Sequence, residues 1–96
     1  MSCNAYHIFF RNLSNPVRIA IISSLKRGDK SVGEIVEELG LEQSKVSHAL
    51  FSMKRCGLVE YRKEGKKRIY TLNKKTILPI LNIIDKHECQ SCENGK

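Results

Sequence analysis

The sequence predicts a single, mainly α-helical domain over residues 1–96 with one small β-hairpin. Two observations support this prediction. Apolar residues recur at helical spacing along most of the chain, and two β-prone runs flank a short glycine-containing loop between residues 58 and 72. A chain of 96 residues can bury one modest core, and its 41% hydrophobic and 28% charged residues are typical of a globular protein.

The chain is basic, with 17 Lys and Arg residues against 10 Asp and Glu residues and a net charge of +7. Such an excess favours a polyanionic partner, which is either nucleic acid or an anionic membrane surface. No run approaches the roughly 18 apolar residues of a membrane span, and the N-terminus lacks a signal-peptide pattern. We therefore expect a cytoplasmic protein with no membrane partner.

Two helices are expected before residue 30. Apolar residues at helix-like spacing predict a short first helix within residues 1–10. Asn15 can cap a second helix, and Pro16 suits its first position because the missing N–H is not needed there. This second helix extends to about Leu25 and is apolar on nearly all sides, which predicts that it is buried. Residues 26–30 form a polar break.

A pair of short helices is expected between Ser31 and Arg55. Ser31 and Glu34 have the S-x-x-E spacing of a capping box, in which each side chain binds a backbone N–H of the other residue. Gly40 is the expected end of the first helix, because a left-handed backbone costs glycine little. The second helix turns an apolar row inward, formed by Val46, Leu50 and Met53.

The outward face of that second helix carries short polar and basic side chains, which are Gln43, Ser44, Lys45, Ser47 and His48. A buried face opposite such a row suits a helix that lies in a DNA major groove, where these side chains can reach base edges and phosphates. The alternative is an ordinary helical hairpin with a solvated face. Both interpretations remain open on this stretch alone.

Gly57 is expected to end the helical pair, and residues 58–62 and 68–72 then form the two strands of the hairpin. The cations around its loop are Arg62, Lys63, Lys66, Lys67 and Arg68. Such residues can simply protect a strand edge from pairing with another chain. Five cations around one loop exceed that need, and we expect them to contact phosphates.

A last helix is expected from Thr76, as its cap, to about His87, with Pro79 in its first turn. Its apolar residues cover more than one stripe, and a domain this small cannot bury so wide a face alone. We therefore predict a homodimer through this helix and the first one, with the interface residues Ile77, Ile80, Leu81 and Ile84. Residues 88–96 are polar and expected to be a flexible tail.

The order of these elements is that of a winged helix-turn-helix, and three motifs add to it. LSNPVRIAIISSL resembles the second-helix signature of the ArsR/SmtB family of metal-responsive repressors, SKVSHAL its recognition helix, and CGLVEYRKEGKKRIYTL its wing. The resemblance covers roughly residues 13–72 and implies a dimeric transcriptional repressor that releases a palindromic double-stranded DNA operator when an effector binds. Glu42 departs from the usual Ser or Thr cap, and Ala49 replaces a bulkier polar residue.

The resemblance implies metal sites at two places, and the sequence supports neither. Relatives carry cysteine at the start of the first helix of the pair, where this chain has Lys30-Ser31-Val32-Gly33. The second family site needs Asp-x-His at the start of the terminal helix, where this chain has Lys74-Lys75-Thr76. Only His87 matches the other half of that site.

A different set of potential ligands lies at the chain termini and consists of Cys3, His87, Cys89 and Cys92. The C-x-x-C of Cys89 and Cys92 can chelate one soft metal, and Cys3 could add a third thiolate in a dimer. Three sulfurs suit arsenite, cadmium or lead, and an added histidine suits zinc. Two alternatives stay open: the C-x-x-C is a redox or sulfur-responsive switch, or the cysteines are incidental and the protein binds DNA without an inducer.

The four cysteines are not spread as a disulfide framework, because three lie near the termini and only Cys56 lies in the middle. We expect free, redox-active or metal-bound thiols in a reducing cytoplasm, with Cys56 as a small core residue. No Ser/His/Asp set, phosphate loop or paired acidic motif predicts an enzyme. An RNA-binding or protein-interaction module is the remaining function class, since winged helices also serve those roles.

Overall fold

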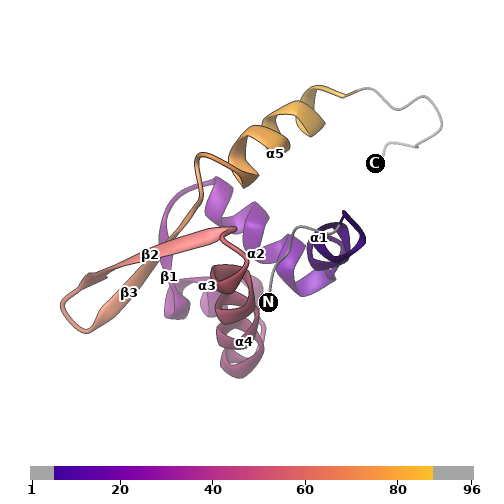
Figure 1. Ribbon diagram of the computed structural model, residues 1–96. Helices are drawn as coiled ribbons and strands as arrows, with labels where there is room; N and C mark the ends of the chain where they lie inside the picture. Colours follow the sequence, from indigo (N-terminus) through magenta and orange to yellow (C-terminus); the bar gives the residue numbers. More distant parts are fainter. Residues whose placement is uncertain (1–5, 88–96) are drawn as a thin grey trace.

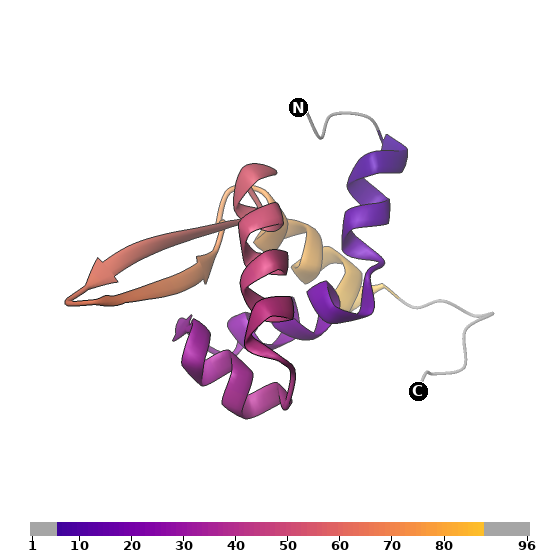
Figure 2. The same cartoon turned by 90° about the horizontal axis from the view of Figure 1, so that it is seen from below.

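The computed structural model describes residues 6–87 as five helices and a three-stranded antiparallel sheet (Figure 1). The helices are α1 Tyr6–Leu13, α2 Pro16–Lys26, α3 Val32–Leu39, α4 Gln43–Arg55 and α5 Ile77–Lys86. The strands are β1 Lys30–Ser31, β2 Val59–Glu64 and β3 Lys67–Leu72, with β3 between the other two. The β2–β3 hairpin projects away from the helices in both views (Figures 1 and 2).

The hydrophobic core lies where α2, α3 and α4 meet the sheet. Ile21 of α2, Ile35 of α3 and Leu50 of α4 are each completely inaccessible to solvent, and Tyr70 and Leu72 of β3 pack against them in the same cluster. The predicted burial of α2 is confirmed for the face that carries Ile21, Ile22 and Leu25, but not all round, because Ile19 is 47% exposed. This core holds α4 between the other helices and the hairpin. The exposed face of α4 and the hairpin therefore keep a fixed position relative to each other.

The helix starts that depend on neighbouring residues form as predicted. The Asn15 side-chain oxygen accepts hydrogen bonds from the backbone N–H groups of Val17 at 2.9 Å and Arg18 at 3.2 Å. The Ser31 backbone N–H donates to Glu34 Oε1 at 2.8 Å, and the Glu34 N–H donates to Ser31 Oγ at 3.2 Å, which completes the capping box. The predicted boundaries of α2 and α3 follow from these caps.

The predicted cap of α5 is wrong. Thr76 has φ −122° and ψ −72°, and its side chain makes no hydrogen bond to the first turn of the helix. Its hydroxyl instead donates to the carbonyl of Gly57 at 3.4 Å. The nearby turn is held by Asn73, whose side-chain oxygen accepts from the Lys75 backbone N–H at 2.9 Å. A hydrogen bond to the distant residue Gly57 therefore replaces the cap hydrogen bond that was predicted within α5.

The hairpin is longer than predicted, and the sheet has one more strand. Its strands extend to Glu64 and from Lys67, which leaves the two-residue turn Gly65–Lys66, with Gly65 at φ +63°. A two-residue turn with glycine first matches the twist of the flanking strands. In the predicted polar break, Lys30 pairs with Tyr70, and the next residue of β1 continues the ladder.

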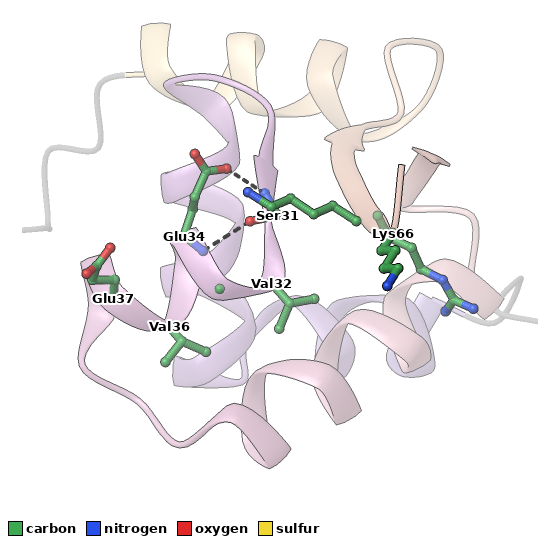
Figure 3. Close-up of a pocket in the computed structure, with 9 residues that line it drawn as sticks. Ser31, Val32, Glu34, Val36, Glu37 and Lys66 are labelled. Atoms are coloured by element: carbon green, nitrogen blue, oxygen red, sulfur yellow. Dashed lines mark hydrogen bonds between the residues drawn. The ribbon is translucent and has the colours of Figure 1, made fainter. Parts of the chain in front are cut away.

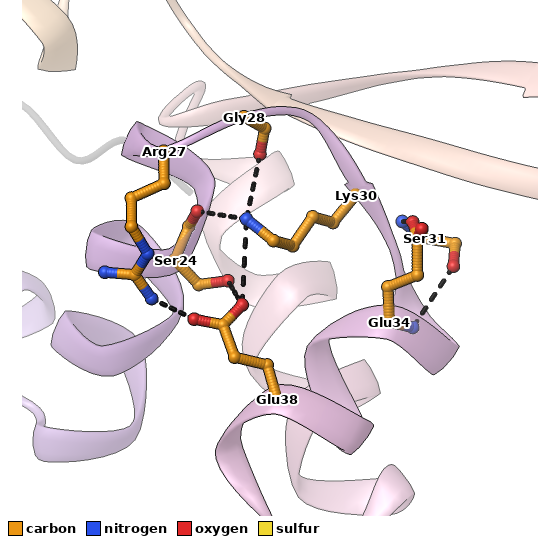
Figure 4. A network of polar contacts seen from close by, with 7 residues as sticks. All are labelled: Ser24, Arg27, Gly28, Lys30, Ser31, Glu34 and Glu38. Carbon is orange, nitrogen blue, oxygen red and sulfur yellow. Dashed lines mark hydrogen bonds and ion pairs between the residues drawn. The ribbon is translucent and has the colours of Figure 1, made fainter.

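The end of α2 is tied to the end of α3 by one carboxylate, that of Glu38 (Figure 4). It accepts a 2.6 Å hydrogen bond from the hydroxyl of Ser24, which is completely buried, and it forms an ion pair with Arg27. The Lys30 ammonium lies 3.6 Å from the same carboxylate and donates to the Ser24 carbonyl at 2.6 Å. These contacts set the position of α3 on α2.

The terminal helix is partly buried within the protomer and partly exposed. Ile77, predicted at the subunit interface, is completely buried in the core, so this assignment is corrected. Ile80 and Leu81 are half-buried, whereas Ile84 is 54% exposed and Ile83 is 70% exposed. The predicted tail 88–96 and residues 1–5 of the predicted first helix lie outside the described residues. No helix of the described part is long and apolar enough to cross a membrane.

Candidate nucleic-acid interface

Helix α4 separates a buried face from an exposed one. Val46, Ala49, Leu50 and Met53 face the core and are at most 6% exposed. The polar residues predicted to face DNA are all exposed, namely Gln43, Ser44, Lys45, Ser47 and His48. Ala49, which departs from the family pattern, is therefore a core residue. That the exposed residues touch DNA stays a prediction.

The N-terminal half of α4 lies beside the first turn of α2. A hollow of about 370 Å³ separates them, with Asn15 and Arg18 on one side and Lys45 and His48 on the other. Arg18 itself is engaged, because its guanidinium donates to Ser52 Oγ at 2.9 Å and to the side-chain oxygen of a residue in α1. Arg18 therefore joins α1, α2 and α4, and it holds the exposed face of α4 in place.

The start of α4 differs from that of α3. Glu42 occupies the N-cap position, and its side chain makes no capping hydrogen bond. The N-cap position predicted for Glu42 is therefore confirmed, and the first N–H groups of α4 are not bonded by this side chain.

The cations of the hairpin are of two kinds. Arg62 is neutralised, because its Nε lies 2.8 Å from Glu64 Oε2 and its Nη1 lies 3.0 Å from Asp29 Oδ2. The pKa of Asp29 is lowered by a hydrogen bond from Thr71 and by that from Arg62, and the pKa of Arg62 is raised by the same carboxylates. Within residues 6–87, no carboxylate lies at ion-pair distance from Lys63, Lys66, Lys67 or Arg68.

Two of these four cations stand directly opposite each other. Lys63 and Arg68 are cross-strand partners in the β2–β3 ladder, and like charges in that arrangement are destabilising. The Arg68 guanidinium lies 4.8 Å from the centre of the Tyr61 ring, so it packs on an aromatic face. An external anion between the two side chains would relieve their repulsion.

An open hollow of about 760 Å³ separates α3 from the tip of the hairpin (Figure 3). Glu34 and Glu37 line the helix side, and Lys66 lines the hairpin side. The resemblance implies a thiolate metal site at the start of α3, but here the position is held by the capping box of Ser31. The hydrogen bond from the Ser31 backbone lowers the pKa of Glu34. Within residues 6–87, no group of three or more His, Cys, Asp or Glu residues could hold a metal.

The predicted terminal metal ligands are mostly outside the described residues. Cys3, Cys89 and Cys92 lie there, and His87 is exposed at the end of α5. Cys56 packs partly buried against the core as predicted, but it is disulfide-bonded, so the prediction of a thiol there is wrong. Spacing in the sequence did not indicate this bond, because disulfide pairing depends on distance in the fold.

Sequence reasoning missed one residue of the exposed face. Phe51 is 63% exposed, and it lies three and four residues after His48 and Ser47, which places it on their side of α4. The Arg55 guanidinium lies 5.9 Å from the centre of its ring. The spacing of seven residues from Ser44 is the sequence signal that places Phe51 on this face.

The chain is similar to known proteins in both its sequence and its fold. Residues 15–61 match the model of the family described as "Bacterial regulatory protein, arsR family". The uncharacterised HTH-type transcriptional regulator Rv0081 of Mycobacterium tuberculosis is 37% identical over 79 residues, which are 81% of this chain and 69% of that protein. Its crystal structure superposes with a TM-score of 0.74 and covers 81% of this chain and 79% of that one.

Two further relatives extend the comparison. A probable mercury resistance operon repressor of Streptomyces lividans is 30% identical, over 91% of this chain and 67% of that protein. The homodimeric winged helix-turn-helix DNA-binding domain Mb0332 of Mycobacterium bovis is 26% identical with a TM-score of 0.73, over 79% of this chain and 70% of that one. On these grounds the chain belongs to the ArsR family of bacterial transcriptional regulators, which bind DNA through a winged helix-turn-helix and are not enzymes.

Proposed function

We propose that this chain is a homodimeric repressor that places one α4 in the major groove of each half of a palindromic operator. The supporting observation is the exposed polar face of α4 beside a hairpin with four cations that lack a carboxylate partner within residues 6–87. In this arrangement the α4 side chains read base edges, and the hairpin cations bind phosphates. The two half-sites would lie about one helical turn apart.

Exposed apolar side chains support the homodimer. Tyr6 and Phe10 of α1 are 84% and 57% exposed, and Ile83 and Ile84 of α5 are 70% and 54% exposed. Large apolar side chains gathered on terminal helices usually mark an interface. The homodimeric relative Mb0332 supports the same assembly, with the predicted contacts now at Ile80, Leu81, Ile83 and Ile84.

The DNA-binding proposal is tested by fluorescence anisotropy with the protein's own upstream DNA and a random duplex. We expect tighter binding to the upstream DNA and a steep loss of affinity with salt, because phosphate contacts release counterions. Ser47→Ala and His48→Ala should change sequence preference, whereas Lys66→Ala should weaken all DNA similarly. Equal affinity for both duplexes at every salt concentration would count against a specific regulator, and the reverse pattern of the variants would refute this division of roles.

We further propose that an effector releases the operator. A soft metal or metalloid held by Cys3, His87, Cys89 and Cys92 is one input, with arsenite, cadmium, lead or zinc as candidates. The relationship to a probable mercury resistance operon repressor supports this hypothesis. Thiolates and an imidazole are the donors that such metals prefer.

The disulfide at Cys56 supports a second input, which is thiol oxidation. A disulfide uses two of the four cysteines, so at most two thiols per chain remain in this form, and a three-thiolate metal site would then need a thiolate from the partner subunit. In the cytoplasm, where a bacterial regulator meets its DNA, disulfides are rare and are usually transient or redox-sensing. The bond at Cys56 therefore favours a redox-responsive repressor as the alternative.

Metal analysis with thiol titration of anaerobically purified protein separates these two inputs. About one tightly bound metal per chain with protected thiols supports the metal sensor. Metal-free protein whose thiols oxidise readily, with a change in operator affinity, supports the redox switch. Unchanged affinity after both metal loading and oxidation would leave a regulator that needs no inducer.

A further inference from the structure

Phe51 is a large apolar side chain on the face of α4 that is directed away from the core. It is 63% exposed, whereas the apolar residues on the opposite face of the helix are almost completely buried. Its spacing of seven residues from Ser44 and three from His48 places the three side chains on one stripe. Within residues 6–87, Phe51 is not part of the hydrophobic core, and its ring is left accessible to a binding partner.

The position of Phe51 along α4 is about one turn beyond His48. Because an α-helix rises about 1.5 Å per residue, Phe51 lies about 4.5 Å beyond His48 and about 10 Å beyond Ser44 along α4. Stacked base pairs are about 3.4 Å apart, so Phe51 reaches a base step next to the one that His48 reaches. Arg55 follows one turn later, with its guanidinium 5.9 Å from the ring centre, where it can bind the phosphate that flanks the contacted base.

The chemistry of the ring selects the base. Phenylalanine offers no hydrogen-bond donor or acceptor, so it cannot recognise the polar edges of adenine, guanine or cytosine. Thymine alone presents an apolar group in the major groove, its 5-methyl group, and phenylalanine is a suitable partner for it. Contact with this methyl group would remove apolar surface of both partners from water.

We infer that Phe51 is a specificity-determining residue that selects thymine in each half-site through contact with the 5-methyl group. The inference rests on the proposed function, because it requires that α4 enter the major groove. It adds an apolar contact to a readout that would otherwise depend on the polar row from Gln43 to His48.

The test begins with the wild-type full chain, which selects bound duplexes from a random library. Each thymine of the enriched half-site is then replaced by deoxyuridine, which lacks only the methyl group. We expect wild type to lose about fourfold in affinity at one position, the change that corresponds to burying one methyl-sized group. Phe51→Ala should bind the thymine and uracil duplexes equally, and Phe51→Leu should keep the preference for thymine.

Ile19→Ala is the matched control, because Ile19 is also an exposed apolar side chain, at 47%, but lies on α2 outside the proposed DNA and subunit interfaces. It should keep the wild-type preference for thymine. Enrichment without any uracil-sensitive position, or equal uracil sensitivity in Phe51→Ala, would overturn this inference and leave the proposed function intact. A smaller sedimenting mass for Phe51→Ala would also overturn it, because Phe51 would then belong to the subunit interface. A library that shows no enrichment would overturn the proposed function itself.

Discussion

At the scale of single residues, hydrogen bonds between near neighbours decide both structure and titration. Glu34 closes the capping box with Ser31, and the resulting hydrogen bonds hold the pKa of its carboxyl below the ordinary value of 4.5. The charged form is therefore favoured in the folded protein. Its contribution to stability is complete above pH 4.5 and is lost as the pH falls through the lowered pKa of the folded state.

Glu34→Gln is predicted to reduce the acid sensitivity of the fold. Glutamine keeps an oxygen that can accept from the Ser31 backbone, but it does not titrate. Between pH 5 and pH 3 the Tm of this variant should therefore fall less than that of wild type, as measured by circular dichroism. Glu37→Gln, on the same helix and outside the capping box, is the control and should follow wild type. Parallel pH profiles for Glu34→Gln and wild type would contradict the assignment.

At the scale of elements, a few polar contacts set how α3 and the hairpin sit on α2. Glu38 adds a polar connection between α2 and α3 to their shared core, because it binds Ser24, Arg27 and Lys30 together (Figure 4). Arg62 has a similar role in the sheet, where it joins β2 to Asp29 in the segment before β1. We therefore expect substitutions of these two residues to change the free energy of unfolding more than substitutions of the exposed cations do.

Glu38→Ala is predicted to lower the free energy of unfolding by about 1–3 kcal/mol, because it leaves the completely buried Ser24 hydroxyl without its acceptor. Thermal unfolding should show a decrease in Tm of several degrees. Glu37→Ala removes a carboxylate one residue earlier and should have little effect. A Glu38→Ala protein as stable as wild type would mean that the network does not hold α3 in place.

Lys63→Gln is predicted to weaken DNA binding without destabilising the fold. It removes the repulsion with Arg68 across the ladder, so the free energy of unfolding should stay unchanged or rise by a few tenths of a kcal/mol. The slope of log affinity against log salt should fall by about 2 for a dimer that loses one phosphate contact per subunit. Arg62→Gln is the contrasting variant. It should lower the free energy of unfolding, and it should reduce the salt slope by less than Lys63→Gln does.

At the scale of the whole molecule, the exposed apolar side chains of α1 and α5 favour association with a second subunit. Ile83 is 70% exposed, so a charge at this position should not disturb the protomer core. The two DNA-reading helices of a dimer bind a palindrome jointly, so loss of the dimer should also reduce affinity for the operator.

Ile83→Asp is predicted to convert the dimer into a species of 11.0 kDa in sedimentation experiments and to weaken operator binding at least tenfold. Ile83→Leu keeps the apolar surface and is the control, with wild-type mass and affinity. A wild-type protein that sediments at 11.0 kDa at micromolar concentration would refute the subunit interface.

Most helices of this protein could be predicted from the sequence, because their starts and ends depend on residues only a few positions apart. Asn15 and Pro16 begin α2, the box of Ser31 and Glu34 begins α3, and Gly40 follows α3 in the left-handed conformation at φ +68°. The exposed polar row of α4 follows from helical periodicity in the same way. These features need no knowledge of distant segments.

Tertiary structure decided the features that depend on residues far apart in the sequence. Strand β1 is two residues long and forms because β3 supplies its hydrogen-bond partners. Ile77 lies in the core rather than at the interface because the fold brings α5 beside α2, to which the Lys26–Asp85 ion pair also joins it. Likewise, Arg62 is neutralised by Asp29, which lies 33 positions earlier. Local patterns determined where the helices begin and end, and long-range packing determined which of their side chains remain exposed to meet DNA or a second subunit.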